Sequence, residues 1–363
     1  MTKRAIIVQY GLGQVGRALV RQILAGREAL AARRGLELRH AALADSTGCL
    51  VGETVLSDAE LQQALTLKER GTGLRHQPGG EGLPLGLPAS CWGADLPVIL
   101  VDVTAAEGME AVALEALQAG WGVVLANKRP LAGDLEAFRR LTSSCRLRWE
   151  ATVGAGLPWI EALSHLLDTG DRVLRLEAAV SGTLGFLTSQ LEAGVPLSAA
   201  VAEARARGYT EPDPRDDLSA ADVRRKALIL ARMLGLAVSW EDVPAEPLYP
   251  LAWGSLSIDE FMAELPGLDR AYAERMAQAL AVGHTLRYSV ELQDGRCAVG
   301  LHEVEKDSPL GALQGPDCLL AIYSERYHPA PLVISGPGAG AEVTAAGVYA
   351  DMIGLALEMH TGS

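Results

Sequence analysis

An aspartate and a lysine stand four residues apart in a segment, 219–234, whose pattern predicts a helix. At about 100° per residue, Asp222 and Lys226 fall on one stripe of that helix together with the apolar Ile229. A lysine beside apolar side chains is suited to proton transfer at a substrate oxygen. The same spacing also describes an ordinary ion pair on a helix surface, worth roughly a few tenths of a kcal/mol. Both interpretations stay open at this point.

The loop that precedes this helix is acidic and contains two prolines, Pro212 and Pro214. Proline restricts the backbone, so Glu211 and Asp217 would be presented in fixed positions. Clustered carboxylates beside a lysine suit a small zwitterionic substrate, because the acids can hold an ammonium group while the lysine lies near a polar oxygen. The loop therefore favours the functional interpretation of Lys226.

A glycine-rich turn, GLGQVG at 11–16, directly follows an apolar stretch at 4–10 and opens a helical pattern at 14–34. Glycines permit a tight turn and let the backbone approach a pyrophosphate, and the helix N-terminus offers free N–H groups. In this strand–turn–helix context the motif predicts dinucleotide binding; a bare tight turn is the alternative. The residues concerned are Gly11, Gly13, Gln14, Val15 and Gly16.

Asp45 follows the second predicted strand, 36–44, where an acidic residue would bind the adenosine ribose and favour NAD. It lies farther from the glycines than the usual spacing of about 20 residues. Ser46 and Thr47 could instead donate hydrogen bonds to the 2′-phosphate of NADP. The sequence favours NAD through Asp45, while NADP and a plain turn residue stay open.

Lys128 lies in the segment 126–130 (ANKRP), at the end of a predicted parallel strand, 122–126. Ligands bind where such strands end in open α/β sheets. Lys128 is therefore better placed for chemistry than a typical exposed lysine.

A second glycine-rich junction, EATVGAGLP at 150–158, connects a predicted strand to a predicted helix. Its carbonyl groups and the Glu150 carboxylate could form a cage for a hard cation. A simple tight junction is the alternative.

The first half of the chain alternates predicted strands with predicted helices, as βαβ units do. The strands are 4–10, 36–44, 98–103, 122–126 and 146–150, and the helices are 14–34, 61–70, 108–119 and 131–141. This order predicts an α/β fold with a doubly wound parallel Rossmann sheet. The Gly- and Pro-rich segment 71–96 indicates a surface excursion with no assigned role.

The second half predicts an α+β domain. Its helices are 158–167, 197–207 and 219–234, and its half-buried antiparallel strands are 287–292, 298–304 and 319–323. A last small-residue helix, 343–359, is expected to pack on the first domain. We therefore expect a dinucleotide-binding domain at 1–150, completed by 338–363, and a catalytic, substrate-binding and dimerisation domain at 151–337.

The composition excludes several classes of protein. Among 363 residues, Asp and Glu number 45 against 32 Lys and Arg, a net charge of −13 that argues against nucleic-acid binding. No apolar run approaches the roughly 18–20 residues of a membrane span. Five scattered cysteines without a CxxC pair argue against a disulfide framework or a thiolate zinc site, and Cys91 is either a reactive or an inert thiol. We expect a cytoplasmic globular protein.

Taken together, these motifs resemble homoserine dehydrogenase. The matching segments, in family order, are GLGQVG (11–16), VDVTAA (101–106), ANK (126–128), EATVGAGLP (150–158), SGTLGF (181–186), GYTEPDPRDDLSAADVRRK (208–226) and GPGAGAEVTAAGV (336–348). The resemblance implies reversible NAD(P)-dependent reduction of L-aspartate 4-semialdehyde to L-homoserine, on the route to threonine and methionine. It also implies a homodimer built through the second domain. Many bacterial members carry a C-terminal ACT domain or a preceding aspartokinase domain; we expect neither here, and therefore expect no feedback inhibition by threonine through such a domain.

The resemblance also implies roles for single residues. Lys226 would exchange the proton at the substrate oxygen, with Lys128 close to it. The remaining roles would be substrate binding by Glu211, Asp222, Asp217, Gly182, Thr183 and Tyr209; cofactor contact by Thr104, Lys128, Gly338 and Gly340; and binding of a monovalent cation, sodium or potassium, by Glu150 and the carbonyls of Val153, Ala155 and Leu157.

In the implied reaction, hydride transfer to the aldehyde carbon places negative charge on its oxygen, which a lysine ammonium would stabilise and protonate. We expect burial to lower the pKa of Lys226 toward the working pH. We also expect Lys128 and Lys226 to face one nicotinamide edge across the cleft between the domains. A catalytically silent dinucleotide sensor, and another dehydrogenase for small amino-aldehydes or hydroxy acids, are the competing interpretations.

Overall fold

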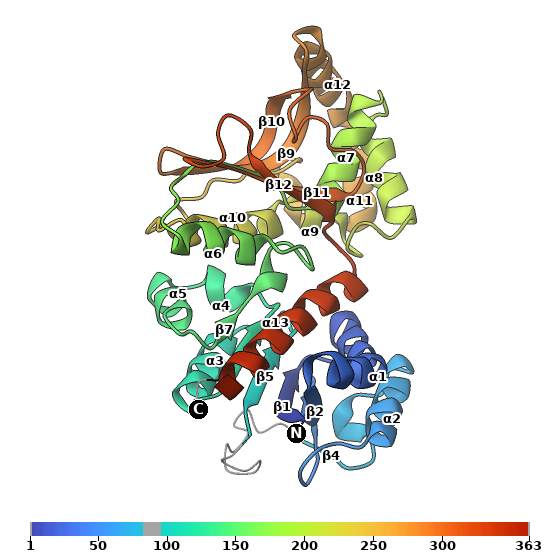
Figure 1. The fold of residues 1–363 in the computed structure, drawn as a ribbon. Helices are drawn as coiled ribbons and strands as arrows, with labels where there is room; N and C mark the ends of the chain where they lie inside the picture. Colours follow the sequence, from blue (N-terminus) through green and yellow to red (C-terminus); the bar gives the residue numbers. More distant parts are fainter. Residues whose placement is uncertain (1, 83–95, 362–363) are drawn as a thin grey trace. The chain divides into compact units, whose positions relative to one another are not determined.

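A computed structural model describes residues 2–82 and 96–361 and divides the chain into two compact units. Unit 1 comprises Met1–Gly156 with Gly340–Ser363, and unit 2 comprises Leu157–Ala339. Cys91 lies outside the described residues. Figure 1 shows the elements of each unit.

Unit 1 contains a seven-stranded sheet in the order β4-β3-β2-β1-β5-β6-β7. Five of its strands are parallel: β1 (Lys3–Tyr10), β2 (Leu36–Ala44), β5 (Val98–Asp102), β6 (Gly122–Leu125) and β7 (Leu147–Arg148). This arrangement, with β1 at the centre and neighbours added on both sides, confirms the predicted doubly wound parallel sheet.

The edge of this sheet differs from the prediction. β3 (Cys49–Val51) and β4 (Gly80–Glu81) add two short antiparallel strands. The described part of the predicted surface excursion, residues 71–82, is mostly exposed, but it also adds the short strand β4 to the sheet edge. A 3₁₀ turn, η1 (Leu74–His76), buries the Leu74 side chain completely in a small apolar cluster. Short apolar contacts inside a Gly- and Pro-rich segment leave no periodic signal, so the pattern could not predict them.

The helices of unit 1 are α1 (Gln14–Arg34), α2 (Asp58–Glu69), α3 (Met109–Gln118), α4 (Arg129–Ala132), α5 (Leu135–Thr142) and α13 (Ala341–Thr361), with a 3₁₀ turn η3 (Glu150–Thr152). The N-terminus of α2 is set by Ser57, whose side chain accepts from Glu60 N–H in a capping box. The C-terminus of α1 is set by Gly35, whose φ of 62° stops the helix. Local chemistry thus explains both ends.

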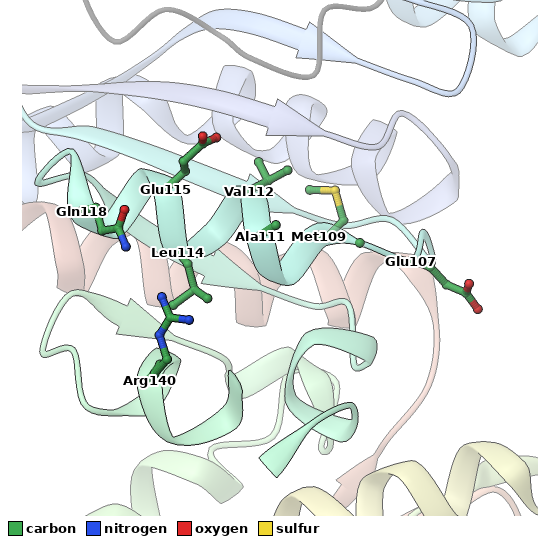
Figure 2. Close-up of a pocket in the computed structure, with 9 residues that line it drawn as sticks. Glu107, Met109, Ala111, Val112, Leu114, Glu115, Gln118 and Arg140 are labelled. Carbon is green, nitrogen blue, oxygen red and sulfur yellow. The ribbon is translucent and has the colours of Figure 1, made fainter. Parts of the chain in front are cut away.

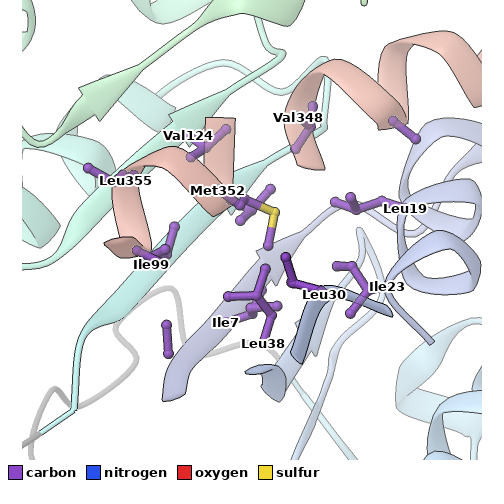
Figure 3. Close-up of a cluster of buried hydrophobic side chains, with 14 of the residues drawn as sticks. Ile7, Leu19, Ile23, Leu30, Leu38, Ile99, Val124, Val348, Met352 and Leu355 are labelled. Carbon is purple, nitrogen blue, oxygen red and sulfur yellow. The ribbon is translucent and has the colours of Figure 1, made fainter. Parts of the chain in front are cut away.

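The C-terminal helix α13 packs in the core of unit 1 (Figure 3). Val348 and Met352 of α13 pack in one cluster with Ile7 of β1 and Leu19 of α1. All four side chains are fully buried. Gly347 lets α13 approach the chain closely, because a Cβ there would lie 2.5 Å from the carbonyl oxygen of Ala155. The last helix therefore belongs to the same core as the first strand.

Unit 2 contains a five-stranded antiparallel sheet in the order β10-β9-β8-β11-β12. The strands are β8 (Val173–Ala179), β9 (His284–Gln293), β10 (Arg296–Glu305), β11 (Asp317–Ser324) and β12 (Leu332–Pro337). The helices are α6 (Trp159–Asp168), α7 (Gly182–Glu192), α8 (Leu197–Ala206), α9 (Pro214–Leu218), α10 (Ala221–Met233), α11 (Ile258–Glu264) and α12 (Pro266–Ala281), with a 3₁₀ turn η4 (Leu251–Ser255). The separate antiparallel sheet confirms the predicted α+β character.

Two strands of this sheet, β8 and β12, are absent from the prediction. β12 is an edge strand whose side chains are all at least partly exposed, so it lacks an apolar face that a pattern could reveal. Among the described residues no helix is long and apolar enough to cross a membrane.

Candidate functional site

The glycine turn of unit 1 is tight enough to require glycine at two of its three positions. Gly11 has a φ of 103°, and a Cβ there would lie 2.8 Å from the Val103 carbonyl oxygen. A Cβ on Gly16 would overlap the carbonyl oxygen of Gly11, whereas one on Gly13 would meet no atom within 4 Å. Gly13 and Gln14 are exposed. The turn therefore has a packed inner side and an open outer side at the start of α1, as a pyrophosphate site requires.

The carboxyl ends of β5 and β6 are joined by a buried polar network. The Asp102 carboxylate accepts from Thr104 N (2.9 Å), Thr104 Oγ1 (2.7 Å) and Asn127 Nδ2 (2.9 Å). Asp102 is fully buried, and burial raises the pKa of its carboxyl. Lys128, half-buried, follows Asn127 directly. Thr104 and Lys128 thus lie at neighbouring strand ends, where ligands bind in such sheets.

Sequence reasoning missed Asp102 and Asn127 as organising residues of this edge. Both stand inside motifs that the family resemblance used, VDVTAA and ANK. The signal that could have found them is a polar residue directly after a buried strand, because a buried polar group must be hydrogen-bonded to something nearby.

The Asp45 carboxylate makes several hydrogen bonds within unit 1. Its Oδ1 accepts from Thr47 N (2.8 Å) and Thr47 Oγ1 (2.6 Å), and its Oδ2 pairs with Lys68 of α2 and accepts from Leu74 N (3.2 Å). Only 4% of the side chain is exposed. Although burial acts in the opposite sense, the Lys68 and Thr47 hydrogen bonds hold the pKa of Asp45 below its usual range. These contacts are those of a turn residue, and the binding of ribose hydroxyls by Asp45 stays a prediction.

Lys226 of α10 is buried and bound on two sides within unit 2. Its Nζ donates to the carbonyl oxygen of Val180 (2.7 Å) and lies 3.0 Å from Asp222 Oδ2. The lysine side chain is 12% exposed and the aspartate side chain 44%. An ammonium buried to this degree is not an ordinary surface ion pair, so the second interpretation of this spacing does not apply.

The expected direction of the Lys226 pKa was wrong. Burial alone lowers the pKa, but the charge of Asp222, followed by smaller contributions such as that of Asp217, raises it above the ordinary lysine value. The sequence placed the carboxylates near the lysine but could not weigh their attraction against desolvation. Lys226 is therefore a persistent ammonium in the free protein.

The acidic loop before α10 is fixed around the same lysine. Asp217 in α9 accepts from Glu211 N (2.8 Å), and the Thr183 hydroxyl in α7 donates to the Tyr209 carbonyl (2.6 Å). Burial raises the pKa of Asp217, and the charges of Glu211 and Asp222 raise it further. The structure thus brings Glu211, Asp217, Asp222 and Thr183 into one electrostatic cluster, to which Tyr209 contributes its backbone carbonyl.

Cys318 lies near both Lys226 and the glycine-rich segment 336–340. A Cβ on Gly338 would overlap Cys318 Sγ, so this approach requires glycine. Burial raises the pKa of the Cys318 thiol, and the nearby Lys226 charge opposes that shift. Sequence reasoning missed Cys318 because an isolated cysteine in an apolar strand carries no local signal. Gly338, a predicted cofactor contact, thus lies in the neighbourhood of Lys226 within unit 2.

The predicted cation site has one buried carboxylate and a tightly turned backbone. Glu150 is 8% exposed, and its N–H donates to Asp351 Oδ2 of α13 (2.9 Å). Ala155 has a φ of 56°, which is unusual for a residue other than glycine. Residues 2–82 and 96–361 contain no group of three or more His, Cys, Asp or Glu side chains that could hold a metal. A site made of Glu150 and backbone carbonyls is of another kind, so it stays a prediction.

A cavity of about 550 Å³ runs along α3 (Figure 2). It is lined by Glu107, Gly108, Met109, Ala111, Val112, Leu114, Glu115, Gln118 and Arg140. None of the predicted site residues lines it, so it is separate from the candidate site.

Comparison with known families agrees with these local features. The family model described as homoserine dehydrogenase matches residues 158–353, and the one described as homoserine dehydrogenase, NAD binding domain, matches residues 11–147. The chain belongs to the homoserine dehydrogenase family.

Two relatives and one solved structure illustrate the match. The chain is 36% identical over 358 residues to the chloroplastic bifunctional aspartokinase/homoserine dehydrogenase 2 of Zea mays, covering 95% of this chain and 38% of that one. It is 41% identical over 261 residues to the homoserine dehydrogenase of Paracoccidioides brasiliensis, covering 67% and 70%. A hyperthermophilic archaeal homoserine dehydrogenase in complex with NADPH has a TM-score of 0.72 and 25% identity, covering 98% of both chains. The chain spans about two fifths of the length of the bifunctional relatives.

Proposed function

We propose that the chain catalyses the NAD(P)-dependent interconversion of L-homoserine and L-aspartate 4-semialdehyde, in the biosynthesis of threonine and methionine. The observation that carries this proposal is the buried Lys226 ammonium, held by Asp222 and the Val180 carbonyl beside an acidic loop. A buried lysine disfavours a silent dinucleotide sensor, because binding a dinucleotide does not need such a group in the second unit.

In this proposal Lys226 hydrogen-bonds the carbonyl oxygen of the semialdehyde and donates a proton to it as charge develops. When bound, the nicotinamide coenzyme supplies the hydride to the aldehyde carbon. Asp222 and the Val180 carbonyl hold the ammonium in place. Glu211 and Asp217 bind the substrate ammonium, and Gly182, Thr183 and Tyr209 complete the pocket. In the reverse direction Lys226 receives the proton from the homoserine hydroxyl.

The coenzyme would be held by the glycine turn of unit 1, by Thr104 and Lys128, and by Gly338 and Gly340. The requirement for glycine at positions 11 and 16, with an open side at Gly13, supports this assignment. Because the Asp45 carboxylate is engaged by Thr47, Lys68 and Leu74, binding of the ribose by Asp45 would require it to exchange these contacts, and the proposal includes both NAD and NADP. That Lys128 and Lys226 face one nicotinamide edge remains part of the proposal.

We also propose a monovalent cation, sodium or potassium, bound by Glu150 and the carbonyls of Val153, Ala155 and Leu157. The position of the Glu150 carboxylate beside the tightly turned backbone at Ala155 supports it, because carboxylate and carbonyl oxygens are the ligands that hard cations take. A cytoplasmic location is proposed as well. Cys49, Cys145, Cys297 and Cys318 are free among the described cysteines, which favours a reducing compartment.

A homodimer through unit 2 is the last element of the proposal. One face of its sheet carries a cavity of about 340 Å³ that includes Arg175, Glu177, Glu291 and His302. In a two-fold dimer the same surface patch of each subunit contacts its copy. A charged patch in such an interface therefore has to carry both positive and negative groups. This face has them: Arg175 lies 3.4 Å from Glu177, and burial together with the Glu291 charge raises the pKa of Glu177. A partner's opposite charge would relieve that repulsion.

The test of the activity is a spectrophotometric assay of nicotinamide reduction with L-homoserine, run in turn with NAD⁺ and NADP⁺. We expect turnover with L-homoserine and at least one coenzyme. Coenzyme binding without turnover would support a sensor, and turnover only with other hydroxy acids would identify a different dehydrogenase.

A further inference from the structure

We propose that Gln9 and His40 form a buried clamp that positions the glycine turn for the dinucleotide. The inference deepens the proposed function, because it rests on coenzyme binding at this turn. All of its observations lie within unit 1.

The first half of the clamp is the Gln9 side chain, which is completely buried in β1. Its Nε2 donates to two backbone carbonyls, that of Gly11 (2.9 Å) and that of Gly16 (3.1 Å). These are the first and last glycines of the motif. One amide group therefore ties together the two ends of the turn.

The second half of the clamp is His40 in β2, which is also completely buried. Its Nε2 lies 3.0 Å from Gln9 Oε1. A carbonyl oxygen can only accept, so His40 carries its proton on Nε2 and donates. This bond fixes which end of the Gln9 amide faces the glycine carbonyls, because a flipped amide would place two acceptors against each other.

The bond to Gln9 is the one hydrogen bond of the His40 ring within the described residues. Its Nδ1 has no hydrogen-bond partner there. Burial lowers the pKa of His40 to about 3, and the charges of Arg27 and Arg39 add to that shift. The ring is thus neutral at physiological pH and acts as a single constant donor toward Gln9.

The clamp matters for binding because of how α1 begins. The N-cap residue Gly13 makes no side-chain hydrogen bond, and no acidic residue lies in the first turn. The first N–H groups of α1 therefore have no side-chain acceptor, which leaves them for a phosphate. Holding the Gly11 and Gly16 carbonyls inward keeps these N–H groups aligned before the coenzyme arrives, so less order must be gained on binding.

The test compares four variants by NADPH and NADH fluorescence titration and by steady-state kinetics. Gln9→Met keeps the side-chain length without the amide, His40→Leu removes the donor, and His40→Gln places an amide N–H near the position of Nε2. Ile99→Val in β5 is the control for a small loss of core packing in the same unit. We expect Gln9→Met and His40→Leu to raise the coenzyme Kd and KM about tenfold, as the loss of one or two hydrogen bonds predicts. The KM for homoserine should not change, and His40→Gln should restore the coenzyme affinity.

Amide hydrogen exchange over residues 11–16, measured without coenzyme, tests the clamp independently of the enzyme activity. We expect faster exchange in Gln9→Met and His40→Leu than in Ile99→Val. If exchange and Kd stay at wild-type values in both variants, or if His40→Gln behaves like His40→Leu, the clamp is wrong. If the wild-type protein binds neither coenzyme, the proposed function fails, and the exchange rates still decide whether Gln9 and His40 hold the turn.

Discussion

At the scale of single residues, Lys226 shows how burial and ion pairing compete for one pKa. Burial is the largest single effect and favours the neutral amine, but Asp222 at 3.0 Å, together with Cys318 and Asp217, favours the ammonium and raises the pKa of Lys226 overall. A lysine of this kind is suited to stabilising an oxyanion and delivering a proton. It is less suited to acting as a free base until a substrate changes its surroundings.

Lys226→Ala should lower kcat by about 10²–10⁴-fold, the range that one proton-transfer group contributes. Coenzyme Kd should stay near the wild-type value, because the glycine turn lies in the other unit. Steady-state kinetics and fluorescence titration measure the two quantities. Lys306→Ala, a more exposed lysine of the same unit, serves as the control and should keep its kcat. A Lys226→Ala protein with wild-type kcat would contradict the assignment.

Asp222→Asn should move the basic limb of the kcat–pH profile for semialdehyde reduction to lower pH. Removing the opposite charge leaves burial to dominate, so the pKa of Lys226 falls. Because the folded-state pKa is raised in the wild type, the pair stabilises the protein below the unfolded lysine pKa. This contribution is lost as pH rises through the folded value. An unchanged basic limb would mean that another group controls it.

At the scale of elements, the strand–turn–helix unit β1–α1 uses some glycines for packing and leaves another open for a ligand. Gly16 packs against the carbonyl of Gly11 and the amide of Gln9, whereas Gly13 faces open space. The three positions of this motif therefore hold glycine for different physical reasons. Sequence spacing alone predicted the motif but could not distinguish these reasons, because the clamp involves His40, 31 residues beyond Gln9.

Gly16→Ala and Gly13→Ala form a matched pair that tests this separation. The Gly16 variant should lose about 1–3 kcal/mol of unfolding free energy through overpacking, and coenzyme affinity with it. The Gly13 variant should keep its stability, since its Cβ meets no atom, and should lose only coenzyme affinity. Urea denaturation and fluorescence titration give the two values. Equal losses of stability in both variants would contradict the interpretation.

At the scale of the whole molecule, the chain forms two units with separate cores, and the first of them is completed by the last helix. Val348, Met352 and Leu355 of α13 are buried in the unit 1 core. Sequence reasoning expected this return from the small-residue pattern of the helix. The pattern could not say which side chains of the sheet would meet it, because that depends on strand order.

The oligomeric state is the prediction that belongs to this scale. Sedimentation equilibrium should give a dimer for the wild type. Arg175→Glu should shift it toward monomer, because the change sets like charges beside Glu177 and Glu291 in the patch. Arg172→Glu is the control; Arg172 lies outside the cavity lining, and its side chain is 70% exposed. A monomeric wild type, or equal shifts in both variants, would exclude this face as the interface.

The sequence by itself determined the parallel sheet, the glycine turn, the acidic loop with its lysine and the family, because these follow from local patterns and from motifs in order. The tertiary structure decided how the polar groups are used. Asp45 closes a turn with Lys68, 23 residues away; Lys226 is held by the Val180 carbonyl, 46 residues away; and Gln9 is oriented by His40. The physical reason is that buried polar groups must find partners wherever the fold brings them, and those partners lie far along the chain.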